Sequence, residues 1–299
     1  MARVRQSTIG TFDVCSWREK LQIESGMYTG GISAALGTGV HGGLELYYQG
    51  RKMGSIPSLV DICEQAVVVF DEEIAKSDQF NWVYQPETSK AELKVLDREE
   101  SIGMIVEILT LYFQHGWYWP EQYEILEVEY YFERDLPVSP AGLVHVATGT
   151  ADLLMRNEDT GRFTMADHKT SKAYTAKSKH GPKDKPQAPY YVWAIGQEYG
   201  LEPHDIAVAF DVMSWKPKYR GQLHERFIRH PFDITQPMVD AIIWKAQLVG
   251  DAVHAGHYYP NPTSFLCSQQ WCDHWERCHF GPALNGEVPV SLQSLKGQA

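Results

Sequence analysis

The chain has 299 residues, enough for one large domain or two small ones, and its hydrophobic and charged fractions, 43% and 22%, are those of an ordinary globular protein. Its net charge of −11 argues against a uniformly basic surface for nucleic acid, although the distribution of charge matters more than the sum. It has neither an apolar run of the roughly 20 residues that cross a bilayer nor the apolar core of a secretory signal, so we expect a cytoplasmic protein without a membrane segment.

Two helices are predicted first, over residues 57–76 and 90–115, because apolar side chains recur there every three or four positions. Cys63 belongs to the apolar stripe of the first helix. Since an unpaired cysteine behaves as a small hydrophobe, we expect it in the core. The chain holds five cysteines, and this odd number does not suit a framework of disulfides in a cytoplasmic protein.

A strand is predicted over residues 123–134, followed by a hairpin of strands 144–155 and 162–168. The turn-rich stretch 157–161 joins the two strands of the hairpin. Residues 162–185 then hold seven Lys or Arg side chains against two Asp. This basic stretch is either a solvated loop or a surface that contacts an anionic partner, and charge alone does not decide between them.

A helix over residues 187–199, ended by Gly200, is predicted next. Two strands follow, 206–215 and 222–228, and then a final helix over 236–255. A hairpin, a helix and a second hairpin, enclosed by helices, predict an α/β fold that borders on α+β and has a mixed central sheet.

An acidic pair and a lysine give the clearest chemical signal. Asp152 lies in the first strand of the hairpin, and Asp167 and Lys169 lie in the second, where alternate residues share a face. Two carboxylates suit Mg²⁺ or Mn²⁺, and a lysine can orient an attacking water or stabilise charge that develops on a phosphate. A lone Asp-x-Lys is more often a surface ion pair, so its meaning depends on the residues around it.

Four motifs occur in order along the chain, and these are Gly37-Thr38-Gly39-Val40-His41, Gly149-x-x-Asp152, Asp167-x-Lys169 and Gln187-x-x-x-Tyr191. Together they resemble the motifs of the PD-(D/E)XK nuclease superfamily, specifically its RecB-like branch, which includes phage exonucleases and CRISPR-adaptation nucleases. The resemblance implies a restriction-endonuclease-like core with a helical N-terminal region, in a single nuclease domain over residues 1–299. This domain would comprise a helical insertion at about 57–119, a catalytic core at about 120–230, and a C-terminal helix and cysteine tail at 235–299.

The resemblance also implies roles for individual residues. His41, Asp152 and Asp167 would bind Mg²⁺ or Mn²⁺, and His168 would add its backbone carbonyl. Lys169 would position the attacking water. For His41 the alternative is a histidine that is exposed or packed against a neighbouring helix.

Gln187 and Tyr191 lie one turn apart on the predicted helix, so both side chains share one face. The resemblance implies that they brace the site or contact DNA, and the alternative is a buried polar pair. Glu129, in the strand before the hairpin, either supports the metal ligands from behind or is an ordinary exposed strand residue.

The remaining cysteines comprise an early one, Cys15, and a late trio, Cys267, Cys272 and Cys278. They resemble the ligands of RecB-like nucleases that hold a structural [4Fe–4S] cluster with one early and three late cysteines. The family most often has two residues between the first two cysteines of the trio, whereas this chain has four. Structural zinc, with His274 or His279 replacing a thiolate, and free thiols therefore stay open.

The function implied is a Mg²⁺- or Mn²⁺-dependent deoxyribonuclease, acting as an exonuclease on single-stranded DNA or duplex ends in recombination, repair or phage DNA processing. The stretch 162–185 and the basic turn 216–220 would follow the phosphate backbone. No P-loop string occurs, so a helicase or recombination protein would be a separate partner. The alternatives are a CRISPR-adaptation-type nuclease within a complex and a nuclease-derived DNA-binding subunit without catalysis.

Overall fold

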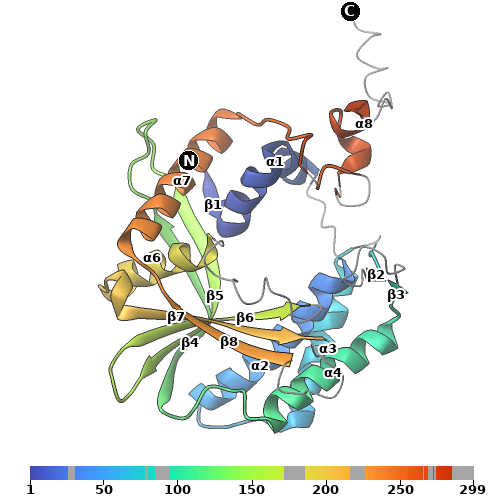
Figure 1. Cartoon of the computed structure of the whole chain (residues 1–299), viewed down its shortest axis with the longest axis vertical. Helices are drawn as coiled ribbons and strands as arrows, with labels where there is room; N and C mark the ends of the chain where they lie inside the picture. The colour runs from blue at the N-terminus through green and yellow to red at the C-terminus, as the bar shows by residue number, and fades with distance from the viewer. Residues whose placement is uncertain are drawn as a thin grey trace, which may run out of the picture. The chain divides into compact units, whose positions relative to one another are not determined.

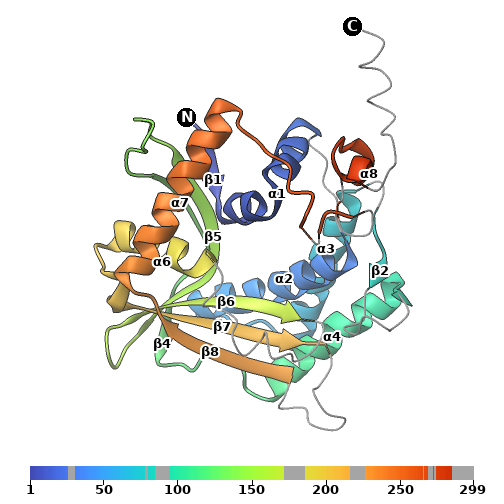
Figure 2. The ribbon, with the colours of Figure 1, turned by 45° about the horizontal axis from the view of Figure 1, so that its top comes forward.

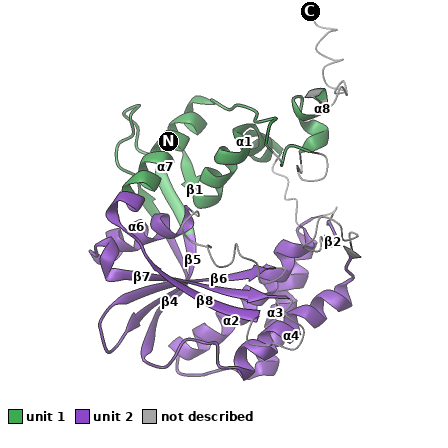
Figure 3. Cartoon of the chain, viewed as in Figure 1, with its two compact units in different colours: residues 1–28, 133–149, 240–299 green, residues 29–132, 150–239 purple. Residues whose placement is uncertain are grey.

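The strands and helices of the chain are seen in a computed structural model (Figure 1). It describes residues 1–25, 31–77, 80–84, 94–171, 186–215, 226–264, 266–268, 272 and 274–284. Two compact units are formed (Figure 3), unit 1 from residues 1–28, 133–149 and 240–299, and unit 2 from residues 29–132 and 150–239. No helix of the described ranges is long and apolar enough to cross a membrane.

A mixed sheet runs through unit 2 and confirms the predicted fold class. Besides β1 (Arg3–Arg5), its strands are β4 (Tyr123–Asp135), β5 (Val146–Asn157), β6 (Phe163–Ser171), β7 (Ile206–Ser214) and β8 (Phe227–Asp233). β5 pairs antiparallel with β6, β6 parallel with β7, and β7 antiparallel with β8, while β4 also pairs with β5. The predicted hairpin is therefore present, and Gly161 at its turn has a φ of 70°, which suits a residue without a Cβ.

Helices cover this sheet (Figure 2). They are α2 (Ile32–Lys52), α3 (Leu59–Ala75), α4 (Arg98–Gln114) and α6 (Gln187–Tyr199). Unit 2 also has three short elements, which are β2 (Val83–Tyr84), β3 (Lys94–Val95) and the η1 turn (Pro203–Asp205). Apolar side chains of α2, α3 and α4 form one buried cluster with side chains from the sheet, and Cys63 packs against this cluster as predicted.

The prediction of a helix over 90–115 and of a strand over 222–228 was wrong at one end each. The helix begins at Arg98, because Asp97 and Glu100 form a capping box that fixes its start. The strand β8 continues to Asp233, well beyond 228, and includes Pro231. β8 is the last strand of the sheet, where a proline costs no internal hydrogen bond. Residues 90–93 and 222–225 lie outside the described ranges.

Unit 1 combines segments from both ends of the chain with residues 133–149, and its helix over residues 6–25 was not predicted from the sequence. Its elements are β1 (Arg3–Arg5), α1 (Gln6–Ser25), most of α7 (Gln236–Ala255), the η3 turn (Trp275–Arg277) and α8 (Gly281–Leu284). β1 pairs parallel with the first residues of β5. Cys15 interrupts α1 with extended backbone, at φ −169° and ψ 103°.

A buried polar cluster connects the segments of unit 1. The imidazole of His145 is fully buried, and its Nε2 lies 2.8 Å from Asp251 Oδ1. The backbone amide of Ala2 donates to His145 Nδ1 at 3.2 Å, and Ser139 Oγ donates to Asp251 Oδ1 at 2.6 Å. Since Nδ1 accepts, Nε2 is the nitrogen that donates to Asp251.

Candidate functional site

Helix α2 is held close to its neighbours by glycines. A Cβ at Gly39 would lie 3.0 Å from the backbone oxygen of Ala66 on α3 and 2.9 Å from Ile105 Cδ1 on α4. Larger side chains at this position would push the helices apart. The opposite side of α2 carries His41 and Glu45, one turn apart, and both line a pocket of about 540 Å³.

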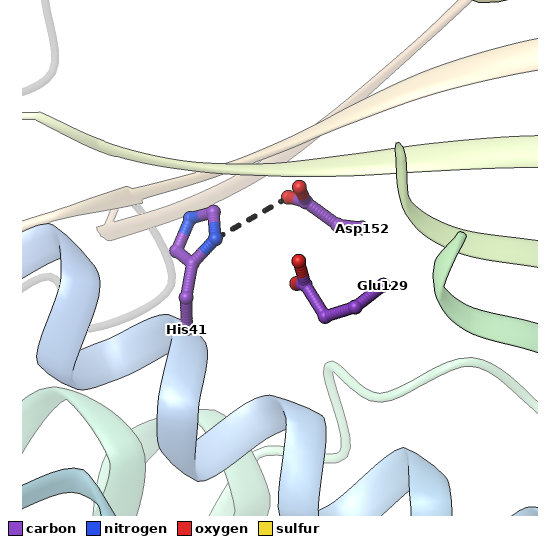
Figure 4. Close-up of side chains that lie close together, drawn as sticks. All are labelled: His41, Glu129 and Asp152. Atoms are coloured by element: carbon purple, nitrogen blue, oxygen red, sulfur yellow. Dashed lines mark ion pairs between the residues drawn. The ribbon is translucent and has the colours of Figure 1, made fainter. Parts of the chain in front are cut away.

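Three potential metal ligands meet at this pocket, and two of them, His41 and Glu129, line it. His41 comes from α2, Glu129 from β4 and Asp152 from β5, and one ligand atom of each lies within 4.8 Å of the other two (Figure 4). His41 Nδ1 is 3.5 Å from Asp152 Oδ2. One imidazole and two carboxylates form a ligand set that suits Mn²⁺ or Mg²⁺, which complete their coordination with water or phosphate oxygens.

Sequence analysis did not count Glu129 among the metal ligands, but expected it to support them or to be an ordinary exposed strand residue. Its φ of 50° is the one positive value among described residues other than glycine, and such backbone strain is typical of functional sites. Burial raises the pKa of Glu129 to about 8, with further contributions from the negative charges of Asp152, Glu45 and Asp167. A divalent cation would offset this repulsion, so the residues present fit a metal ion.

The position of Asp152 follows from the hairpin. β5 and β6 pair from Arg156 opposite Phe163 to Leu153 opposite Ala166. Just beyond this ladder, the backbone amide of His168 donates to Asp152 Oδ2 at 2.7 Å. One oxygen of this carboxylate is therefore oriented by the neighbouring strand, as expected for a preorganised ligand.

Asp167 and Lys169 form the ion pair that their shared strand face predicts. Lys169 Nζ lies 2.7 Å from Asp167 Oδ2, and the amide of Gln187 donates to Asp167 Oδ1 at 2.6 Å. Asp167 is fully buried, and burial, together with the charge of Asp152, raises its pKa, while Lys169 opposes this shift. Both oxygens of Asp167 are engaged in these contacts, and the three ligand atoms that lie within 4.8 Å of one another include Glu129. The metal-binding role predicted for Asp167 stays a prediction.

Tyr191 extends this network along α6. Its hydroxyl interacts with the side chain of Gln187 and with the backbone of Thr150, and burial raises its pKa. Gln187, Tyr191, Asp167 and Lys169 are thus brought together, with Lys169 also lining the pocket of the trio. The basic residues 172–185 and 216–220 lie outside the described ranges.

His168 points to the face of β6 opposite to Asp167 and Lys169. Its imidazole is 3% exposed and stacks on Tyr48 of α2, with ring centroids 5.7 Å apart. Burial lowers the pKa of His168 to about 4, so the ring is neutral at pH 7.

The four cysteines of the early and late segments line one cavity in unit 1, and they are Cys15, Cys267, Cys272 and Cys278. The pKa of Cys267 is raised by burial and then by the other three thiols, which is consistent with their proximity. The backbone amide of Asn261 donates to Cys15 Sγ at 3.4 Å. Four thiols around one cavity are a donor set that fits either a [4Fe–4S] cluster or zinc.

Several solved structures are similar to the chain, including two that match most of its length, and no curated protein matches it. One, named as a candidate exonuclease from Eubacterium rectale, has a TM-score of 0.51 and 11% identity, and the match covers 92% of this chain and 87% of that one. The other, SSO0001, has a TM-score of 0.37 and 14% identity, and covers 87% and 92%. The family model of the PD-(D/E)XK nuclease superfamily matches residues 5–279, and the chain therefore belongs to this superfamily.

Proposed function

We propose that the protein is a Mg²⁺- or Mn²⁺-dependent deoxyribonuclease whose metal is held by His41, Glu129 and Asp152. The observation that carries this proposal is the meeting of the three ligand atoms within 4.8 Å, at a pocket that His41, Glu129 and Lys169 line. The trio differs from the ligand set expected from sequence, since Glu129 takes the place given to Asp167. His168 keeps the role proposed for its backbone carbonyl.

A bound divalent ion would polarise a phosphate oxygen and lower the pKa of a water that attacks the phosphorus. Lys169 is a suitable donor to this water or to the phosphate, since its side chain is 30% exposed and its ammonium is held in place by Asp167. Gln187 fixes Asp167, and Tyr191 fixes Gln187. Both residues of α6 therefore act by holding the lysine and its carboxylate.

For the substrate, we propose DNA ends and an exonuclease of the RecB-like branch. The order of the four motifs supports this, as does the name of the similar protein from Eubacterium rectale, although that likeness concerns the fold alone. A recombination or helicase protein as partner, action within a CRISPR-adaptation complex, and a cytoplasmic location stay predictions. A DNA-binding subunit without catalysis is the second candidate, and it would bind DNA without cleaving it.

We further propose that the two units form one nuclease domain, because the family match extends from residue 5 to 279 and includes segments of both. For the four cysteines we propose a structural [4Fe–4S] cluster, with zinc as the alternative. The support is the convergence of one early and three late thiols on a single cavity.

The test is cleavage of end-labelled linear single-stranded and duplex DNA, and of closed circles, with Mn²⁺ or Mg²⁺. We expect loss of linear DNA from its ends, survival of circles, and no cleavage with EDTA. Asp152→Asn, Glu129→Gln and Lys169→Met should abolish cleavage in folded protein, whereas Asp159→Asn, in the exposed turn of the hairpin, should not. Cleavage by Asp152→Asn at the wild-type rate would contradict the proposed site, and cut circles would contradict exonuclease action.

A further inference from the structure

A row of buried polar side chains crosses three adjacent strands of unit 2. His168 of β6 is the register partner of Asp211 on β7, and Asp211 is the partner of Arg229 on β8. His168 and Asp211 are 3% and 4% exposed. Polar groups that are buried this deeply usually have a defined role, because removing them from water costs free energy.

The far end of the row is rigid. Arg229 donates to both carboxylate oxygens of Asp211, from Nε at 2.6 Å and from Nη2 at 2.8 Å. Nη2 also donates to the backbone oxygen of Trp117 at 2.8 Å, and the guanidinium lies 3.7 Å from the ring centre of Trp119. A bidentate pair with these extra contacts fixes the position of Asp211.

The near end of the row reaches the metal-binding trio. The ring of His168 lies between two carboxylates, with Nε2 at 3.9 Å from Asp211 Oδ2 and Nδ1 at 3.8 Å from Asp152 Oδ2. Nε2 is buried and has no hydrogen-bond partner among the described residues, and it is directed toward Asp211. The imidazole therefore fills the space that separates a fixed carboxylate from a proposed metal ligand.

The faces of the His168 ring are also held. One face stacks on Tyr48, whose hydroxyl lies 2.9 Å from that of Tyr112 and accepts from the amide of Trp119 at 3.2 Å. His41 meets the His168 ring edge-on, with centroids 6.2 Å apart. Both side-chain ligands nearest to His168, His41 and Asp152, thus rest against it.

We infer that His168, Asp211 and Arg229 are positioning residues, which hold Asp152 in place for metal binding. Asp211, which Arg229 fixes, faces Nε2 of the imidazole at 3.9 Å, and Nδ1 of the imidazole lies 3.8 Å from the Asp152 carboxylate. The backbone amide of His168 orients one oxygen of that carboxylate. This role rests on the proposed function of Asp152. It extends the proposed metal site to side chains that do not themselves contact the metal. Outer residues of this kind commonly change metal affinity by about 10- to 100-fold when they are replaced.

The test is to measure the dissociation constant for Mn²⁺ from the electron paramagnetic resonance signal of free Mn²⁺. The proteins compared are wild type, His168→Phe, Asp211→Asn and the double variant. His168→Phe keeps the ring on Tyr48 and the backbone amide, but removes both nitrogens. We expect each single change to weaken Mn²⁺ binding about tenfold and to lower kcat with little change in the KM for DNA. The double variant should bind Mn²⁺ no more weakly than His168→Phe, since Asp211 acts through that ring.

Asp251→Asn is the matched control, because it removes the charge from a His–Asp contact in unit 1. It should lower the Tm and leave Mn²⁺ affinity within about twofold. If His168→Phe does not fold, His168→Gln replaces it. Wild-type Mn²⁺ affinity in the folded His168 variant, or fully additive losses in the double variant, would overturn the inference. A wild-type protein that binds no Mn²⁺ would instead overturn the proposed function.

Discussion

The carboxylates of Glu129 and Asp152 come from strands β4 and β5 and approach within 4.8 Å of each other. This proximity adds to the effect of burial, which raises the pKa of Glu129 to about 8. Like charges at this distance destabilise the folded protein until a cation lies between them. The pair therefore lowers the stability of the metal-free protein and raises its affinity for a metal ion, as functional sites commonly do.

Replacing Glu129 by Gln should stabilise the metal-free protein and flatten its dependence on pH. The carboxyl has an ordinary pKa of 4.5 and a pKa of about 8 when folded, so between these values the folded protein binds more protons than the unfolded chain. Stability of the wild type therefore falls as pH rises through this window. Urea unfolding with EDTA at several pH values from 5 to about 8.5 measures the slope.

Asp167 contributes to the slope with the same sign, and Glu129→Gln leaves that contribution in place. The control is Glu127→Gln, on the same strand, whose side chain is 43% exposed and pairs with Lys52. It should keep the wild-type pH dependence. An identical slope in Glu129→Gln and wild type would show that Glu129 is not perturbed as described.

Gly39→Ala should destabilise the protein by about 1–3 kcal/mol, because the added methyl group would overlap with the backbone of Ala66 and with Phe70 Cβ, each 3.0 Å away. Since His41 lies two residues further along α2, nuclease activity should fall as well. Gly103→Ala is the matched control on α4, where an added Cβ meets nothing within 4 Å. Helix propensity predicts a gain of about 0.5–1 kcal/mol there. Equal effects of the two changes on denaturant midpoints would contradict the close packing of α2.

Much of the fold could be predicted from local pattern. The helix 187–199 and its end at Gly200 match the structure, because Gly200 has the left-handed φ of 67° that terminates helices. The hairpin matches because strand alternation and a turn-rich sequence agree. The start of α4 carried a signal, Asp97-x-x-Glu100, but the apolar periodicity favoured an earlier start.

The site was less predictable, because it depends on tertiary geometry. A glutamate in a strand of alternating residues resembles a solvated side chain, and nothing in the local sequence predicts the positive φ of Glu129. One of the two contacts that engage Asp167 comes from Gln187, 20 positions later, and only the fold shows it. The order of the motifs predicted which segments would meet, whereas the positions of Glu129, Asp152 and Asp167 relative to one another follow only from the fold.

Neutralising the four lysines of the basic stretch should weaken DNA binding and reduce its salt dependence. These residues, Lys177, Lys179, Lys183 and Lys185, lie outside the described ranges, so the prediction rests on sequence. Each lost phosphate contact should lower the slope of log affinity against log salt by about 0.7–0.9. The control of equal charge is a change of Lys20, Lys52, Lys76 and Lys245 to Gln, which removes ion-paired lysines. Equal slopes for both variants would show that the basic stretch is an ordinary solvated loop that does not contact DNA.

The four cysteines of unit 1 allow a prediction that separates ligands from core residues within the same chain. Anaerobically purified protein should be brown and contain about four irons per chain. Cys15→Ala should bleach this colour and lower the Tm, because Cys15 is the early residue that lines the cavity with Cys267, Cys272 and Cys278. Cys63→Ala should keep the colour and cost roughly 1 kcal/mol, since that thiol only packs against the core of unit 2. Colourless protein with one zinc per chain would replace the cluster by zinc, whereas stable protein free of both metals would contradict a metal at these thiols.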